Sequence, residues 1–142
     1  MKYLLFPLLL IFSAGVFAKT YYCTQVSNTS LSYTYPGEQP YVYEGETTDN
    51  IFKVVIDLKN EVLKVRVLDN SSETFWDLYN ITKQSDDKDR FRVTATKSNI
   101  DFFTQIFSLM LTDSKKNNEV KLFENRMNVL GSYTNTFKCS RE

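Results

Sequence analysis

The stretch FKVVIDLKNEVLKVRV, residues 52–67, carries the pattern that decides the fold. Apolar and polar side chains alternate on both sides of a short polar break at Lys59 and Asn60. A period of two is typical of a strand that buries one face, because successive side chains point to opposite sides of a sheet. Two such runs joined by a short turn predict an antiparallel β-hairpin.

Runs of the same kind recur along the rest of the chain. They predict further strands over residues 74–82, 90–97, 118–124 and 127–139. The polar residues 83–89 are predicted to form a loop. Gly131, inside the last run, indicates a bulge or a close approach of another backbone.

The segment IDFFTQIFSLML, residues 100–111, fits two interpretations. Phe103 and Phe107 fit the apolar stripe of a helix. Phe102 and Ile106 equally line one face of a strand that is apolar on both sides. The neighbouring strands and the turn-rich sequence that follows favour a strand, which forms a long hairpin with the next one.

Four tyrosines flank a break at residues 36–40 that contains proline and glycine. Spacing by two places each tyrosine pair on one face of a strand, so an aromatic hairpin at the edge of the main sheet is predicted. Exposed tyrosines make rigid contacts for a partner or ligand, although cross-strand packing alone also explains them. The candidate contact residues are Tyr33, Tyr35, Tyr41 and Tyr43, together with Trp76, which suits either a core or a ligand cavity.

The N-terminal 18 residues have the organisation of a secretory signal. Lys2 precedes an apolar run at residues 3–12, and a small-x-small ending predicts cleavage after Ala18. This run is shorter than the roughly twenty residues that a membrane-spanning helix needs, and no later segment is long and apolar enough. We therefore expect residues 1–18 to be a signal peptide and residues 19–142 to be a single β domain, periplasmic or secreted, with no stable membrane insertion after cleavage.

Two cysteines, Cys23 and Cys139, lie near opposite ends of the expected mature chain. A lipid anchor on Cys23 is excluded because Tyr21 and Tyr22 precede it, where a lipoprotein would have its cleavage site. In exported proteins, paired cysteines form disulfides because the compartment is oxidising. Two cysteines allow only one intramolecular pairing. We therefore predict a disulfide that ties the first strand to the last.

Together these runs predict an all-β fold, an antiparallel meander of about eight strands. A meander buries its apolar face in a small up-and-down barrel, closed or half-open, or in a two-sheet β-sandwich. The predicted disulfide favours the barrel, because closure brings the first and last strands together. The architecture resembles ligand-binding barrels such as lipocalins and avidins, but their Gly-x-Trp motif near the first strand is missing, and Phe75-Trp76-Asp77 lies in the middle of the chain.

The sequence contains no histidine, the commonest general base and the commonest transition-metal ligand. Serine or cysteine catalysis through a histidine is thereby excluded, and no catalytic residue, metal site or cofactor is predicted. The chain has 17 Lys+Arg and 17 Asp+Glu, so the loss of Lys2 with the signal leaves 16 against 17. This balance gives no electrostatic footprint for a nucleic-acid partner.

Carboxylate chemistry survives these exclusions, because a glycosidase needs only two acidic side chains at a suitable separation. Asp77 and Asp101 interrupt apolar runs. Each is expected to face solvent or to find a partner, because a buried unpaired carboxylate is costly. The other acidic candidates are Glu44, Glu46, Asp49, Asp69 and Glu73.

These observations favour an exported, non-enzymatic binding or interaction protein of the cell envelope. Its partner would be a small apolar molecule in the concavity of the sheet, or an envelope protein on the tyrosine-rich edge. The alternatives are a carboxylate-dependent hydrolase of the glycosidase type and a structural envelope component without a ligand site.

Overall fold

Alternating side chains produce strands throughout the part of the chain that the structure describes. The computed structural model describes residues 18–32, 39, 41–68, 75–99, 105–128 and 131–142. These ranges hold nine antiparallel strands and no helix, hence no helix able to cross a membrane. The strands are β1 (Lys19–Ser32), β2 (Tyr41–Glu44), β3 (Ile51–Asp57), β4 (Val62–Leu68), β5 (Asp77–Asp86), β6 (Arg90–Asn99), β7 (Gln105–Ser114), β8 (Glu119–Asn128) and β9 (Gly131–Arg141).

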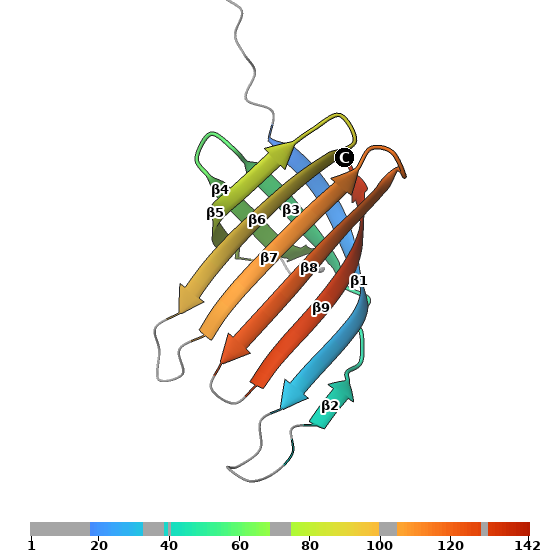
Figure 1. Ribbon diagram of the computed structural model, residues 1–142, viewed down its shortest axis with the longest axis vertical. Helices are drawn as coiled ribbons and strands as arrows, with labels where there is room; N and C mark the ends of the chain where they lie inside the picture. Colours follow the sequence, from blue (N-terminus) through green and yellow to red (C-terminus); the bar gives the residue numbers. More distant parts are fainter. Residues whose placement is uncertain (1–17, 33–38, 40, 69–74, 100–104, 129–130) are drawn as a thin grey trace, which may run out of the picture.

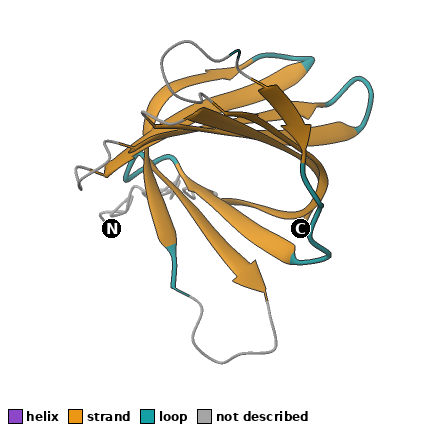
Figure 2. Ribbon diagram, turned by 90° about the horizontal axis from the view of Figure 1, so that it is seen from below, coloured by secondary structure: helices purple, strands orange, loops and turns teal. Residues whose placement is uncertain are grey.

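The strands form one sheet that closes on itself. Their order is β2-β1-β3-β4-β5-β6-β7-β8-β9, and β1 also pairs with β9 (Figure 1). Eight strands therefore make a closed up-and-down barrel, and β2 is an additional strand beside β1. Figure 2 views the barrel from below and shows the strands curving around a common interior. The predicted meander and barrel are confirmed, and the described strands do not form the alternative two-sheet sandwich.

The seam of the barrel is the long strand β1. It pairs with β9 from Tyr21 to Ser32, while its other edge is shared between β3 and then β2. Cys23 lies directly opposite Cys139 across the β1–β9 ladder, and the two form a disulfide with a Cα–Cα distance of 4.0 Å. The predicted bridge between the first and last strands is confirmed.

The interior is filled by the inward-facing member of each alternating pair. In the β3–β4 hairpin, Val54 and Ile56 of β3 and Leu63 of β4 are completely buried. The turn of this hairpin needs a left-handed residue, supplied by Glu61 with φ of 54°. The predicted hairpin over residues 52–67 is confirmed, and the core continues around the barrel through Tyr21, Phe91, Val93, Ala95, Leu111, Val120 and Leu122.

One end of the barrel carries a polar cluster. The Tyr21 hydroxyl donates a hydrogen bond of 3.1 Å to Asp113 Oδ2, and Arg141 Nε donates to both oxygens of the same carboxylate at 3.2 and 3.0 Å. Burial alone would raise the pKa of Asp113, but the hydrogen bonds from Arg141 and Tyr21 and the charge of Arg141 outweigh it and lower the pKa. The buried carboxylate is therefore ionised and fully partnered.

The prediction of a loop over residues 83–89 is wrong for most of its length. β5 continues to Asp86, and residues 83–86 pair with residues 91–94 of β6 after a register shift between Ile81 and Lys83. These side chains are polar because they lie exposed near the end of the barrel. The ladder still forms, since it satisfies backbone groups whatever the side chain.

The prediction of one strand over residues 127–139 is also wrong. β8 ends at Asn128 and β9 begins at Gly131, so the run spans a connection between two strands. The Gly131 amide donates a hydrogen bond of 2.9 Å to Asn128 Oδ1. A Cβ on Gly131 would lie 2.3 Å from the carbonyl oxygen of Leu31, which confirms the predicted close approach of another backbone.

Two further expectations concern segments that are described only in part. Residues 105–111 belong to strand β7, which confirms the strand interpretation there, while residues 100–104 lie outside the described residues. β2 pairs with residues 29–32 of β1, so a strand lies at the sheet edge as predicted, while Tyr33, Tyr35 and most of the predicted turn lie outside the described residues.

Removal of the disulfide is expected to lower stability strongly. The bridge joins residues 116 positions apart, and the chain-entropy model assigns a loop of that length about 4–5 kcal/mol. The Cys23→Ala/Cys139→Ala double variant should lose stability of this order in urea unfolding followed by circular dichroism. Reduction of the wild type provides the control, and a loss below about 1 kcal/mol in both would contradict the role of the seam.

Low pH should reduce the stability that the Asp113 cluster contributes to the fold. Because the folded pKa of Asp113 lies below its unfolded value of about 3.9, its contribution is present above that pH and is lost as the pH falls through the folded pKa. Asp113→Asn should lose about 1–2 kcal/mol at pH 7, since Arg141 is partly exposed. The difference in unfolding free energy between wild type and Asp113→Asn should become smaller between pH 5 and pH 2, as measured by denaturant unfolding at each pH. If the difference in unfolding free energy stayed constant over that range, the lowered pKa assigned to Asp113 would be wrong.

Candidate functional site

The end of the barrel opposite Asp113 holds a cavity of about 860 Å³. It is bounded by the end of β4 and β8, the beginning of β3, β5, β7 and β9, and the middle of β1. Its deeper wall is apolar and contains Phe52, Val65, Leu109, Leu122 and Phe137. Phe52 and Phe137 meet edge to face with ring centroids 5.1 Å apart, which fixes this part of the wall.

The upper wall of the cavity is polar. Arg126 pairs with Glu124 at 3.0 Å, and Lys97 pairs with Asp77. Asn135 donates a hydrogen bond of 2.8 Å to Glu124, and Gln25 donates one of 3.0 Å to Asn135. We call these six residues on strands β1, β5, β6, β8 and β9 the polar belt: Gln25, Asp77, Lys97, Glu124, Arg126 and Asn135. Five of them line the cavity, and the sixth, Lys97, lies beside it through its ion pair with Asp77.

Aromatic rings lie between the charges of the polar belt. The Lys97 ammonium is 5.6 Å from the ring centroid of Phe107 and 5.7 Å from that of Tyr79. The Arg126 guanidinium carbon is 5.5 Å from the same Phe107 ring. Both cations are within reach of favourable cation–π contacts, which hold them beside the Phe107 ring.

Tyr79 lies below the charges and is almost completely buried. Its pKa is raised above the ordinary value, first by burial and then by the negative charges of Glu124 and Asp77. The phenol is therefore neutral at any physiological pH and serves as a hydrogen-bond donor rather than a base.

The structure describes the side chains of only two of the predicted contact residues, Tyr43 and Trp76. Tyr33 and Tyr35 lie outside the described residues, and Tyr41 pairs with Ser32 in β2. Tyr43 is exposed on β2, and neither it nor Trp76 is among the described residues that line the cavity.

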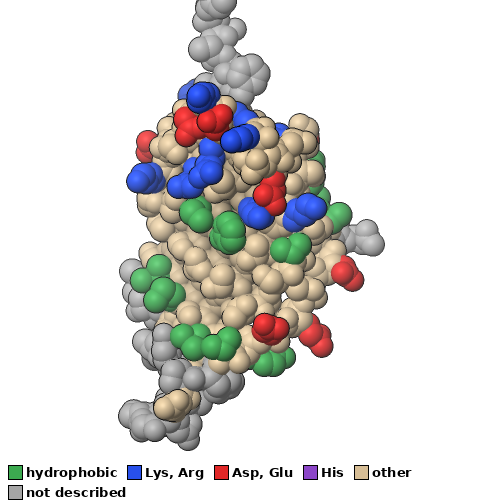
Figure 3. Space-filling view, turned by 45° about the vertical axis from the view of Figure 1, so that its right-hand side comes forward, with side chains coloured by type: hydrophobic (Ala, Val, Ile, Leu, Met, Phe, Trp, Pro, Cys, Tyr) green, Lys and Arg blue, Asp and Glu red, His purple; other side chains and the backbone are tan. Residues whose placement is uncertain are grey.

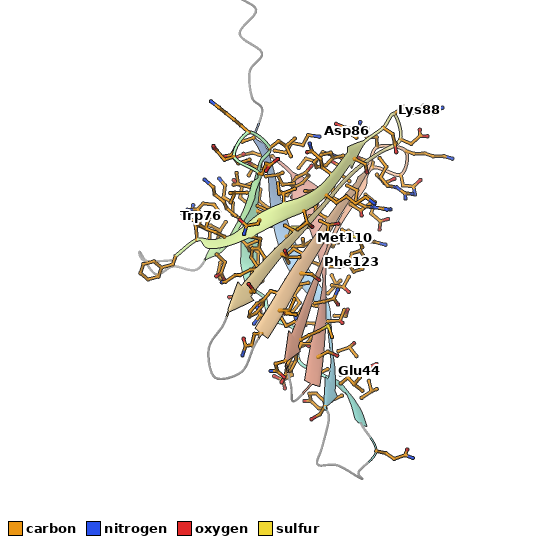
Figure 4. The ribbon with its side chains drawn as sticks, turned by 60° about the vertical axis from the view of Figure 1, so that its left-hand side comes forward. Glu44, Trp76, Asp86, Lys88, Met110 and Phe123 are labelled. Carbon is orange, nitrogen blue, oxygen red and sulfur yellow. A yellow bond between two sulfur atoms is a disulfide. The ribbon has the colours of Figure 1, made fainter. Side chains whose placement is uncertain are left out.

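Trp76 lies at the beginning of β5 and is far from the β2 edge. Figure 4 shows Trp76 well separated from Glu44, the neighbour of Tyr43. The guanidinium carbon of Arg66 lies 4.8 Å from the Trp76 ring centroid. The flanking residues Phe75 and Asp77 line the cavity instead.

Sequence reasoning missed the polar belt, although a signal for it was present. In β6 the inward positions run from Val93 through Ala95 to Lys97, and in β8 from Leu122 to Glu124 and Arg126. Every second residue of a strand faces the interior. A change from apolar to charged residues at these inward positions marks the place where the strand leaves the core and reaches the polar belt.

The expectations for the acidic residues are met where they can be examined. Asp77 finds a partner in Lys97, as predicted, and Asp101 lies outside the described residues. In the described part of the chain, no group of three or more histidine, cysteine or acidic residues is placed to hold a metal ion. No protein-family model matches the chain, and comparison with curated proteins found no match.

Glu124 should be important for the integrity of the cavity wall. Glu124→Gln removes the charge that pairs with Arg126 but keeps the size, so we expect a loss of about 1–2 kcal/mol in unfolding free energy. Glu119→Gln is a matched control, because Glu119 and Lys121 form an exposed pair worth less than about 1 kcal/mol. Equal losses for the two variants in urea unfolding would contradict a structural role for Glu124.

Proposed function

We propose that this protein is an exported, non-enzymatic binding protein that holds a small molecule in the open end of its barrel. The observation that carries the proposal is the cavity of about 860 Å³, which falls within the roughly 300–1,000 Å³ typical of ligand sites. Its apolar depth suits a hydrophobic body, and the polar belt suits a more hydrophilic end. The ligand is therefore amphiphilic rather than uniformly apolar.

An extracytoplasmic location supports the same proposal. The disulfide at the seam needs an oxidising compartment to form and persist. The signal expected at residues 1–18 would deliver the chain there. A binding protein in the periplasm or outside the cell meets small amphiphiles released from membranes or taken from the surroundings.

A partner on the β2 edge is less well supported. Val26, Val42 and Tyr43 are exposed around β1 and β2. Figure 3 shows hydrophobic side chains scattered over one face, with the Lys and Arg side chains in its upper half and several Asp and Glu side chains in its lower half. Scattered single apolar residues are normal on a protein surface and do not define a docking site.

Among the described residues, the acidic side chains that line the cavity are Asp77 and Glu124, so in this part of the chain the hydrolase alternative would use this pair. Glu124 is held by Arg126 and Asn135, and Asp77 by Lys97. A glycosidase requires one of its two carboxyl groups to act as a proton donor. Carboxylates that accept hydrogen bonds from cationic side chains suit structure and binding better.

A cavity-filling variant tests the proposed function. Val67 lines the cavity, and Leu68 is its neighbour on β4 and faces outward. Val67→Trp should weaken the binding of N-phenyl-1-naphthylamine, an apolar fluorescent probe, by about tenfold or more, because the indole occupies its space. Leu68→Trp should leave the affinity within about twofold.

Fluorescence enhancement of the probe and its displacement by amphiphiles give the affinities. Circular dichroism of both variants checks the barrel. The proposal fails if wild type gives no enhancement, or if both tryptophan variants bind the probe as wild type does.

A further inference from the structure

The charged side chains among the described residues that line the cavity are balanced in sign: Arg66, Asp77, Glu124 and Arg126. Asp77 and Lys97 form one pair, and Glu124 and Arg126 form the other. Within each pair one side chain is deeper, since Lys97 is 34% and Glu124 8% exposed, against 61% for Asp77 and 52% for Arg126. One negative and one positive group are therefore left accessible at the cavity mouth.

These two exposed groups keep capacity for further hydrogen bonds. Lys97 bonds to Oδ1 of Asp77, but an ionised carboxylate offers about four acceptor positions. Arg126 bonds to Glu124 through one terminal nitrogen, whereas a guanidinium has five N–H donors. A ligand can thus place a cationic group on Asp77 and an anionic group on Arg126.

The register of the strands sets the two charges at opposite ends of one row. Lys97 of β6 pairs with Phe107 of β7, which pairs with Arg126 of β8. Asp77 extends the row through its ion pair with Lys97. The row therefore runs from a negative end, past the Phe107 ring, to a positive end.

An aromatic side chain strengthens the negative end of this row. Phe75 lies two residues before Asp77, lines the cavity and is exposed. Aromatic faces attract cations, and quaternary ammonium groups in particular are recognised by rings together with nearby negative charge. This end of the row is therefore suited to the cationic part of a ligand.

We propose that the ligand is a single-chain amphiphile with a zwitterionic head group, a conclusion that rests on the binding function proposed above. The chain occupies the apolar depth beside Leu109 and Leu122. The cationic part of the head lies against Asp77 and Phe75, and the anionic part accepts hydrogen bonds from Arg126. A head with one net charge leaves that charge uncompensated against a neutral belt, whereas a zwitterion matches both ends.

Probes that share a twelve-carbon chain isolate the contribution of the head. Isothermal titration calorimetry would compare dodecylphosphocholine with dodecyl sulfate, dodecyltrimethylammonium and dodecyl maltoside, each below its critical micelle concentration. Dodecylphosphocholine should bind at least about tenfold more tightly than either singly charged probe. Phosphocholine without a chain should bind far more weakly, because the apolar depth contributes most of the affinity.

Each other outcome overturns a specific part of the argument. Equal affinities for all four dodecyl probes refute the zwitterionic head but leave the binding function standing. Failure of all four to bind refutes the binding function itself. Tight binding of phosphocholine alone refutes the amphiphile and indicates a free head-group compound as the ligand.

Two charge-removing variants test the assignment of the ends. Asp77→Asn should shift the preference toward dodecyl sulfate, and Arg126→Gln should shift it toward dodecyltrimethylammonium, each by about fivefold to tenfold in the ratio of the two affinities. The ratio is insensitive to a partial loss of folded protein. Glu119→Gln on the outer surface should leave the ratio unchanged. Shifts in the same direction, or none, would overturn the proposal.

Discussion

The pairing of β1 with β9 is the constraint on which the rest of the structure depends. An open meander of this length would leave two edge strands with unpaired backbone groups, and such edges invite pairing with other chains. Closure along Tyr21–Ser32 of β1 satisfies both edges at once. Closure also gives the sheet an inner and an outer face, so alternate side chains of each strand point either into the barrel or into solvent. The disulfide lies within this ladder and makes its closure covalent.

A bulge in β1 decides which side chains reach the cavity. The register shifts between Gln25 and Ser27, so the extra residue Val26 changes the parity of all that follow. Before the shift Tyr21 and Cys23 face the core, and after it Asn28 faces the cavity. β1 also extends beyond the part that β3 covers, and β2 pairs with the remainder. One strand therefore serves the core, the seam and the cavity wall.

Much of this fold could be predicted from the sequence, because its determinants are local or unique. Alternation over residues 52–67 identified a hairpin, and the two cysteines allowed only one bridge, which implied closure. The failures occurred where backbone geometry overrides side-chain pattern. The polar end of β5 forms a ladder after a bulge, and the run over residues 127–139 contains the end of β8 and the beginning of β9, because period-two patterns do not show where pairing partners change.

The candidate site could not be predicted for a related reason. Trp76 and the tyrosines were predicted as contact residues because large aromatic side chains are common in binding sites. The polar belt consists of charged and amide residues that are common on any protein surface, and only their inward direction distinguishes them. Their inward direction depends on register, and register depends on closure and on bulges. Only the parity of Lys97, Glu124 and Arg126 relative to the core residues of the same strands carried the information.

Ion pairs between acidic and basic side chains occur at both ends of the barrel, but they differ in how many of their hydrogen-bonding positions are already used. At one end Arg141 engages both oxygens of Asp113, Tyr21 contributes another hydrogen bond, and the carboxylate is buried while Arg141 stays partly exposed. At the open end each ion pair has one deep and one exposed member, so part of its hydrogen-bonding capacity faces the mouth. A buried carboxylate that already accepts several hydrogen bonds, as Asp113 does, has little capacity left for a ligand, because exchanging its partners would leave its charge unpaired. A half-exposed pair costs less to rearrange, and its partner positions are already set by neighbouring strands. The chain therefore keeps charges with spare hydrogen-bonding capacity at the larger cavity and saturates the buried carboxylate of Asp113 at the other end.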